Sequence, residues 1–200
     1  MDTVTERVRV AVIIGSTREG RFGPRVAEWF AAHARRRPEL DIDLVDLAET
    51  GLPEALTDPY ADTGAPPPGP VGALAPRLAA ADAFVVVTPE YNRSIPAPLK
   101  TAIDWFYREW QAKPVAVVAY GRDSGGALAA AHLRQVFAEV HAVTVPDAVL
   151  LPRYWELFAP DGSWPKPTAD REAALKTTLD QLIWWAHALR EARTARPYTG

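Results

Sequence analysis

The sequence contains no cysteine among its 200 residues. Without thiols there can be no disulfide framework, no iron–sulfur cluster, no thiolate zinc site and no cysteine nucleophile. Any redox chemistry must therefore come from a bound cofactor. The four histidines lack the paired spacing typical of metal ligands, so we expect no metal site.

Long apolar runs are also missing. No stretch reaches the roughly 18 apolar residues that read as a membrane-spanning helix, and the amino-terminal residues show no apolar signal-peptide segment. The net charge is −3, and the basic residues are scattered rather than clustered, so there is no positive field for nucleic acid or anionic lipid. We expect a cytoplasmic protein that binds neither nucleic acid nor membranes.

What is present is an alternation of apolar strands and amphipathic helices. Strands are predicted at 8–14, 40–47, 83–87, 115–119 and 142–151, the second of them half exposed at the sheet edge. Helices are predicted at 23–37, 71–81, 98–107, 126–140 and 168–192. This order favours a doubly wound α/β fold, a five-stranded parallel sheet with helices on both faces. We expect one domain over 1–200, with an ordered core at about 7–190 and long loops at 50–70 and 152–167.

In such a sheet, ligands bind beyond the carboxyl ends of the strands. The segment after the first strand, Gly15 to Gly23, combines small, hydroxyl and basic residues and leads into a helix N-terminus. Free N–H groups, the helix dipole and the Arg18 guanidinium make it suited to a terminal phosphate. Thr17 replaces the second glycine of a dinucleotide fingerprint, so a monophosphate fits better. The alternative is an ordinary turn with an exposed arginine.

The segment after the third strand, Thr88 to Lys100, is stiffened by three prolines and holds the only asparagine of the chain, Asn92. It suits the polar edge of a flat heteroaromatic ring, or equally a turn capped by Asn92. Lys100 opposes the helix dipole in a first turn, and it precedes Asp104 in the less favourable order for a helical ion pair. We therefore expect Lys100 to have a tertiary partner.

The segment after the fourth strand, Tyr120 to Gly126, contains Asp-Ser-Gly-Gly. A trypsin-like nucleophile is rejected, because this segment joins a strand to a helix in an α/β chain without disulfides. The glycines are expected to let the backbone approach a ligand, and Ser124 is expected to cap the next helix.

Together these segments resemble the NADPH-dependent FMN reductase family of flavodoxin-like proteins, which includes quinone, azo-dye and chromate reductases. The chain matches Gly-Ser-x-Arg at Gly15 to Arg18 and Tyr-Gly-x-x-Ser-Gly-Gly at Tyr120 to Gly126. The longest match, Pro-Glu-Tyr-Asn-x-Ser-x-Pro-x-x-Leu-Lys-x-x-x-Asp-Trp, lies at Pro89 to Trp105 and is the specific one. The likeness covers roughly residues 7–190.

The resemblance implies the strand order 2-1-3-4-5, non-covalent FMN, and a homodimer or homotetramer. In the family, the residues matched by Ser16 and Arg18 hold the FMN phosphate, while two other segments flank the isoalloxazine ring. The predicted cofactor-binding residues are Gly15, Ser16, Arg18, Phe22, Gly23, Pro89, Glu90, Tyr91, Asn92, Ser124, Gly125 and Gly126. The long loop 50–70 and the aromatic residues Tyr154, Trp155, Phe158 and Trp164 depart from the family pattern, and we expect these aromatics to cover the open face of the flavin.

The resemblance also implies the reaction, in which hydride passes from NADPH or NADH through FMN to a quinone, azo compound or free flavin. The cofactor carries the chemistry, so no side chain is assigned as catalytic. One alternative is a non-catalytic FMN electron-transfer protein like flavodoxin, which steady-state NAD(P)H oxidation would distinguish. Another is a Rossmann-type NAD(P) enzyme without flavin, which the absorbance spectrum would distinguish.

Overall fold

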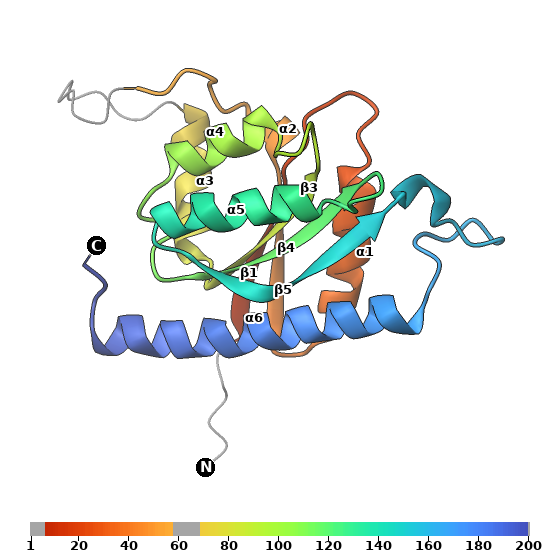
Figure 1. Ribbon diagram of the computed structural model, residues 1–200. Coiled ribbons are helices and arrows are strands. Elements are labelled where there is room, and N and C mark those ends of the chain that lie inside the picture. Colours follow the sequence, from red (N-terminus) through yellow and green to blue (C-terminus); the bar gives the residue numbers. More distant parts are fainter. Residues whose placement is uncertain (1–6, 58–68, 200) are drawn as a thin grey trace, which may run out of the picture.

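The computed structural model describes residues 7–57 and 69–199, which form a five-stranded parallel sheet with helices on both faces (Figure 1). The strands are β1 (Val8–Ile14), β2 (Leu40–Asp46), β3 (Ala83–Pro89), β4 (Pro114–Gly121) and β5 (Val143–Pro152). The helices are α1 (Gly23–Ala34), α2 (Leu47–Thr50), α3 (Gly69–Ala80), α4 (Ala97–Trp105), α5 (Ala127–Glu139) and α6 (Ala169–Ala195), with a 3-10 turn η1 (Tyr154–Glu156). The strand order in the sheet is β2-β1-β3-β4-β5, and every neighbouring pair is parallel, which confirms the predicted flavodoxin-like arrangement.

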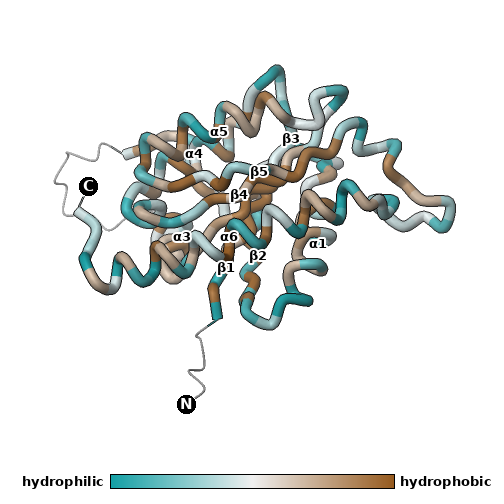
Figure 2. Tube along the Cα trace, turned by 60° about the horizontal axis from the view of Figure 1, so that its bottom comes forward, coloured by the Kyte–Doolittle hydropathy of each residue, from teal (hydrophilic) through white to brown (hydrophobic). Residues whose placement is uncertain are grey.

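The burial of each strand follows its place in the sheet. All residues of β3 and β4 are buried, which explains why these strands are apolar without alternation. The edge strand β2 alternates between buried or half-buried and exposed positions over Leu40 to Leu44, as its Asp-rich sequence predicted. The apolar strands accordingly form the brown centre of the trace in Figure 2.

Two apolar layers flank the sheet. Helices α3, α4 and α5 contribute to the core on one face, and α1 and α6 contribute to the core on the other. Figure 1 shows α6 running along the underside of the sheet as a single long helix. Its buried stripe, Leu175, Leu179, Leu182 and Ala186, confirms four of the five positions predicted from helical spacing, and Leu189 is half-buried. No helix within 7–57 and 69–199 is long and apolar enough to cross a bilayer.

The segment after β2 differs from the prediction. The strand ends at Asp46, and Leu47–Thr50 forms a single helical turn, because the Asp46 side chain accepts a hydrogen bond from Ala48 N and Gly51 adopts φ 64° at the end of the turn. The predicted loop 50–70 thus begins inside a helix, and α3 begins at Gly69 rather than at position 71; residues 58–68 of that loop lie outside the described residues. At the end of α1, the helix stops at Ala34, three residues before the predicted boundary.

Lys113 is an exception to the apolar character of the interior. Its side chain is 6% exposed, and its Nζ donates to the carbonyl oxygens of Leu78 and Ala79 at 3.0 and 2.8 Å, at the end of α3. Burial, the largest cause, and the neighbouring cation Arg193 together lower the pKa of Lys113 to about 8, against the opposing influence of Asp82 and Glu109. The two carbonyl contacts explain why a lysine is tolerated there, since a cation suits the end of a helix.

This burial makes stability depend on pH. The folded-state pKa lies below the unfolded value of 10.5, so folding disfavours the proton, and stability rises with pH between about 8 and 10.5. The free energy of unfolding of the wild type, relative to Lys113→Met, should therefore increase over this window by up to about 3 kcal/mol. Urea unfolding of both proteins between pH 7 and about 10.5 measures it; a difference that stays constant with pH would contradict the burial argument.

Candidate flavin site

The three predicted segments meet at the carboxyl ends of β1, β3 and β4. Ser16 Oγ lies 2.9 Å from the Tyr91 hydroxyl, which joins the segment after β1 to the one after β3. The Ser124 hydroxyl donates to Glu90 Oε1 at 2.9 Å, which joins the segment after β3 to the one after β4. The structure therefore brings together residues that are as much as 108 positions apart in the sequence.

The segment after β1 has the free donors that an anion requires. The backbone N–H groups of Ser16 to Gly20 donate to no described residue, and no side chain caps the N-terminus of α1. The exposed Arg18 guanidinium makes no hydrogen bond or ion pair with any residue in 7–57 or 69–199. These groups are suited to an anion such as a phosphate group.

A second arginine in this segment has a different role. Arg21 donates through both terminal nitrogens to the Asp46 carboxylate at 2.7 Å, and both side chains are largely buried. This bidentate pair fastens the segment to the end of β2 and fixes its path. Arg18 is therefore the arginine that remains available to a ligand.

The segment after β3 begins with a two-residue hairpin. Tyr91 and Ser94 exchange backbone hydrogen bonds of 2.9 Å, and the turn residues Asn92 and Arg93 adopt φ of 50° and 66°. Two successive positive φ angles are typical of a type I′ turn, which favours Asn at its first position. Ser94 Oγ lies 2.8 Å from His132 Nδ1, so α5 also supports the hairpin. Asn92 is an exposed turn residue at the tip, where its side chain is available to a ligand.

Glu90 faces the protein rather than solvent. Its Oε2 accepts hydrogen bonds from the backbone N–H groups of Leu128 and Ala129 at 2.9 and 3.3 Å, at the start of α5. The prediction that Ser124 caps this helix was wrong: the cap residue is Gly126, and Ser124 Oγ accepts from Gly126 N at 3.3 Å just before the helix. A carboxylate is the better cap here because it also complements the helix dipole.

The glycines of the third segment are required by packing within the protein. Gly126 has φ 95°, and a Cβ there would lie 2.4 Å from the Cβ of Ala119. Gly125 has φ 63°, and its Cβ would lie 2.9 Å from Pro152 N. Sequence reasoning assigned these glycines to the approach of a ligand and did not reveal this packing requirement.

The aromatic residues of 152–167 pack mainly on Phe22. Its ring centroid lies 4.8 Å from those of Tyr154 and Trp164, and Phe158 also contacts it. Phe22 and this loop thus support the start of α1, next to the proposed phosphate site. Trp155 and Phe158 remain 43% and 42% exposed.

Sequence reasoning missed the helical turn α2 and a cavity beside it. A cavity of about 490 Å³ adjoins the segment after β1, and it is lined by Thr17, Leu47, Ala48, Thr50, Gly51, Leu52, Glu54, Ala97, Pro98 and Thr101. Most of these residues belong to α2, the segment that follows it, and the start of α4. The spacing of Asp46 and Glu49 before Gly51 is the pattern that indicates the turn.

The expectation for Lys100 was also wrong. Its Nζ bonds both carboxylate oxygens of Asp104 at 2.7 Å within α4. The local pair forms in spite of its less favourable order, because both side chains lie on the same exposed helix face.

A sequence model of the NADPH-dependent FMN reductase family matches residues 8–156. The chain belongs to this family. It is 36% identical over 155 residues to an NAD(P)H-dependent FMN reductase of Schizosaccharomyces pombe, covering 72% of this chain and 74% of that protein. It is 31% identical over 189 residues to a 2-hydroxy-1,4-benzoquinone reductase of a Burkholderia species, covering 92% and 98%.

A solved structure shares this fold over almost its whole length. It is FerB, a flavoenzyme NAD(P)H:(acceptor) oxidoreductase of Paracoccus denitrificans, with a TM-score of 0.71, 30% identity, and coverage of 90% of this chain and 98% of that one. These relatives confirm the predicted class, an FMN-dependent NAD(P)H oxidoreductase, over the non-catalytic electron carrier.

The Arg18 assignment is open to a direct test. Arg18→Ala should weaken FMN binding by about 1.5–3 kcal/mol, the contribution of a hydrogen bond to a charged group. Riboflavin, which lacks the phosphate, should lose much less. Fluorescence titration of the apoprotein measures both, with Arg36→Ala, an exposed arginine beyond the end of α1, as the control. Equal losses for FMN and riboflavin would place Arg18 away from the phosphate.

Proposed function

We propose that this protein binds FMN in the site described above and uses NADPH or NADH to reduce a small quinone. The observation that carries the proposal is a set of donors beside the Tyr91 hydroxyl: the N–H groups of Ser16 to Gly20 and the Arg18 guanidinium, which have no hydrogen-bond partner within 7–57 and 69–199. An anion site next to a rigid aromatic loop fits a ligand that carries both a phosphate and a flat ring, such as a phosphorylated flavin.

Each predicted residue has a proposed role. Arg18 and the N–H groups around Ser16 and Thr17 bind the phosphate. Tyr91 and Asn92 flank the ring on one side, and the backbone of Ser124 to Gly126 borders it on the other. When bound, FMN supplies the hydride chemistry between the nicotinamide and the acceptor. The protein contributes binding and orientation, so no acid or nucleophile is assigned.

The remaining predicted binding residues act on the shape of the site. Glu90 holds two of its segments together, Pro89 ends β3, and Phe22 packs the start of α1 against the aromatic loop. Close contacts surround Gly15 and Gly23, whose Cβ atoms would each lie 3.0 Å from a neighbouring aliphatic side chain. We propose that these five residues fix the backbone around the flavin rather than select it chemically.

A quinone is the proposed acceptor because the relative that aligns over 98% of its length is named a 2-hydroxy-1,4-benzoquinone reductase. The 490 Å³ cavity supports this choice, since it adjoins Thr17 and has both apolar walls and hydroxyl groups. Exposed Trp155 offers a ring surface for a planar acceptor.

The wider setting belongs to the same proposal. We propose a single FMN-binding domain that works as a homodimer or homotetramer in the cytoplasm, where NAD(P)H is available. Two described tryptophans, Trp155 and Trp184, are 43% and 64% exposed, which supports association through aromatic surface. Light scattering of the purified protein measures the oligomeric state.

The purified protein should be yellow, with the absorbance of oxidised flavin, and acid should release FMN. Steady-state oxidation of NADPH and of NADH, each with 1,4-benzoquinone as acceptor, should depend on the bound flavin and reveal the preferred reductant. Trp155→Ala should change the KM for the quinone more than the FMN content. Protein that stays colourless after refolding with excess FMN would refute the flavin assignment, whereas bound FMN without turnover would favour an electron carrier.

A further inference from the structure

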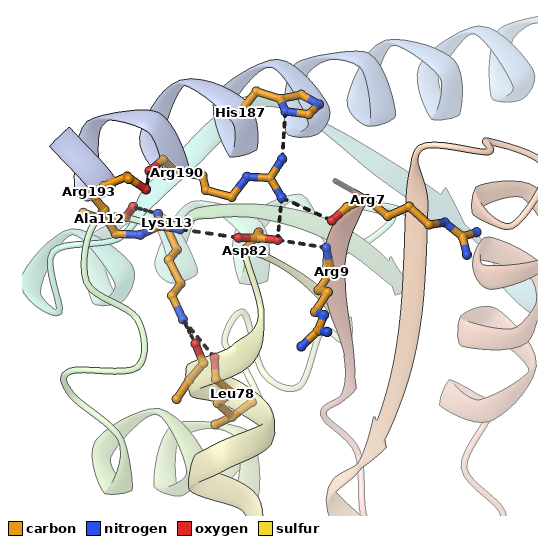
Figure 3. Close-up of polar contacts among 11 residues, drawn as sticks. Arg7, Arg9, Leu78, Asp82, Ala112, Lys113, His187, Arg190 and Arg193 are labelled. Carbon is orange, nitrogen blue, oxygen red and sulfur yellow. Dashed lines mark hydrogen bonds and ion pairs between the residues drawn. The ribbon is translucent and has the colours of Figure 1, made fainter. Parts of the chain in front are cut away.

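A second polar cluster lies at the amino ends of β1, β3 and β4, at the opposite end of these strands from the candidate flavin site (Figure 3). The Asp82 carboxylate accepts hydrogen bonds from Arg9 N at 3.0 Å and from Arg190 Nη1 at 3.3 Å, and it forms an ion pair with Arg193 Nη2 at 3.7 Å. One carboxylate is therefore shared by two arginines. Lys113, immediately before β4, adds a third cation beside them.

A cavity of about 330 Å³ adjoins this cluster, and we call it the basal cavity. It is lined by Ala79, Arg108, Glu109, Gln111, Lys113, Arg193, Pro197 and Tyr198. Three of these side chains are cations and one is a carboxylate, so the lining carries an excess of two positive charges. None of the proposed flavin-site residues belongs to it.

The cations of the basal cavity are poorly compensated. Burial lowers the pKa of both Lys113 and Arg193, and each of the two also experiences neighbouring cations that lower it further. Asp82 opposes this effect for both and Glu109 opposes it for Lys113, but Asp82 is already shared with Arg190. An anion placed in the cavity would stabilise both charges at once.

Both cations also have donors left for a ligand. The Lys113 ammonium carries three hydrogens and uses two contacts, to the carbonyl oxygens of Leu78 and Ala79. The Arg193 guanidinium carries five and is held by Ala112 O and Asp82. The exposed guanidinium of Arg108 forms no hydrogen bond or ion pair with a residue in 7–57 or 69–199, and is free to turn toward a ligand.

We propose that the basal cavity binds a small phosphate dianion, either free phosphate or the phosphate group of a small metabolite, through Lys113, Arg193 and Arg108. The charge of a dianion matches the excess of two in the lining, and phosphate oxygens accept several charge-assisted hydrogen bonds together. Glu109, the one carboxylate of the lining, disfavours more extended anions that would approach it. The proposal is independent of the flavin chemistry.

The test uses the holoprotein with saturating FMN, so that the flavin phosphate site is filled. Inorganic phosphate should raise the melting temperature above that in chloride of equal ionic strength. Arg108→Ala should weaken the phosphate affinity at least tenfold, as expected for loss of a charge-assisted hydrogen bond. Lys113→Met should also abolish the effect, whereas Arg36→Ala, outside both sites, should retain it. Glycerol 3-phosphate in a parallel series distinguishes a phosphate monoester from free phosphate.

Calorimetry provides a readout that a purely structural role would not change. Binding of an anion near pH 8 should draw a proton onto Lys113, because the negative charge stabilises the ammonium form, which burial and Arg193 disfavour and Asp82 and Glu109 favour. Arg108 lines the same cavity as a further cation. Titrations in two buffers of different ionisation enthalpy should show this uptake in the wild type and not in Lys113→Met. Equal stabilisation by phosphate and chloride in the wild type, or the same phosphate effect in all variants, would overturn the proposal.

Discussion

The shape of the candidate flavin site depends on the hydrogen bonds that the Glu90 carboxylate accepts. Glu90 follows the last residue of β3. Its carboxylate accepts a hydrogen bond from the Ser124 hydroxyl and caps the first turn of α5. Hydrogen bonds to a charged group contribute about 1.5–3 kcal/mol each, and the helix dipole adds to them. A carboxylate shared in this way holds the segments after β3 and β4 at a fixed separation before any ligand binds, which lowers the ordering cost of binding.

The other two ties extend the same principle. Ser16 and Tyr91 connect the segment after β1 to the hairpin, and Arg21 and Asp46 connect it to β2. In contrast, Arg18 and the N–H groups of Ser16 to Gly20 have no partner among the residues that the structure describes, and they are suited to an anion. The site therefore separates residues that build it from residues that bind.

The parallel sheet and the meeting of the three segments at one end of its strands could be predicted from the sequence for a physical reason, whereas the strand order was implied by the family resemblance. Strands buried on both faces must be apolar, and the ends of parallel strands must meet at one edge, so segments such as Pro89 to Asn92 could be placed together without coordinates. Side-chain partners were not predictable, because they depend on distances between distant segments. Glu90 was assigned to the ring and Ser124 to a cap, and their observed contacts do not follow from local spacing. The Lys100–Asp104 pair has ordinary i,i+4 spacing, but the less favourable order of its charges led to the prediction of a tertiary partner instead.

The charged groups at the two ends of the strands, carboxyl and amino, also differ in how they are paired. At the carboxyl edge, ion pairs such as Arg21 with Asp46 are satisfied within the protein, and free donors point to a ligand. At the amino edge, Asp82 is divided between two arginines, and Lys113 is buried beside Arg193. Uncompensated charge of this kind is where a folded protein gains most from a bound counter-ion.

The most direct test of the account is a double-mutant cycle on FMN affinity with Glu90→Ala and Ser124→Ala. If Glu90 positions the two segments through Ser124, each single variant should weaken FMN binding and the double variant should cost less than their sum, with a coupling of about 1–3 kcal/mol. Because neither side chain is required to contact FMN in this account, riboflavin should show the same coupling. Additive effects, or FMN affinity unchanged in both single variants, would contradict the claim that this contact forms the site.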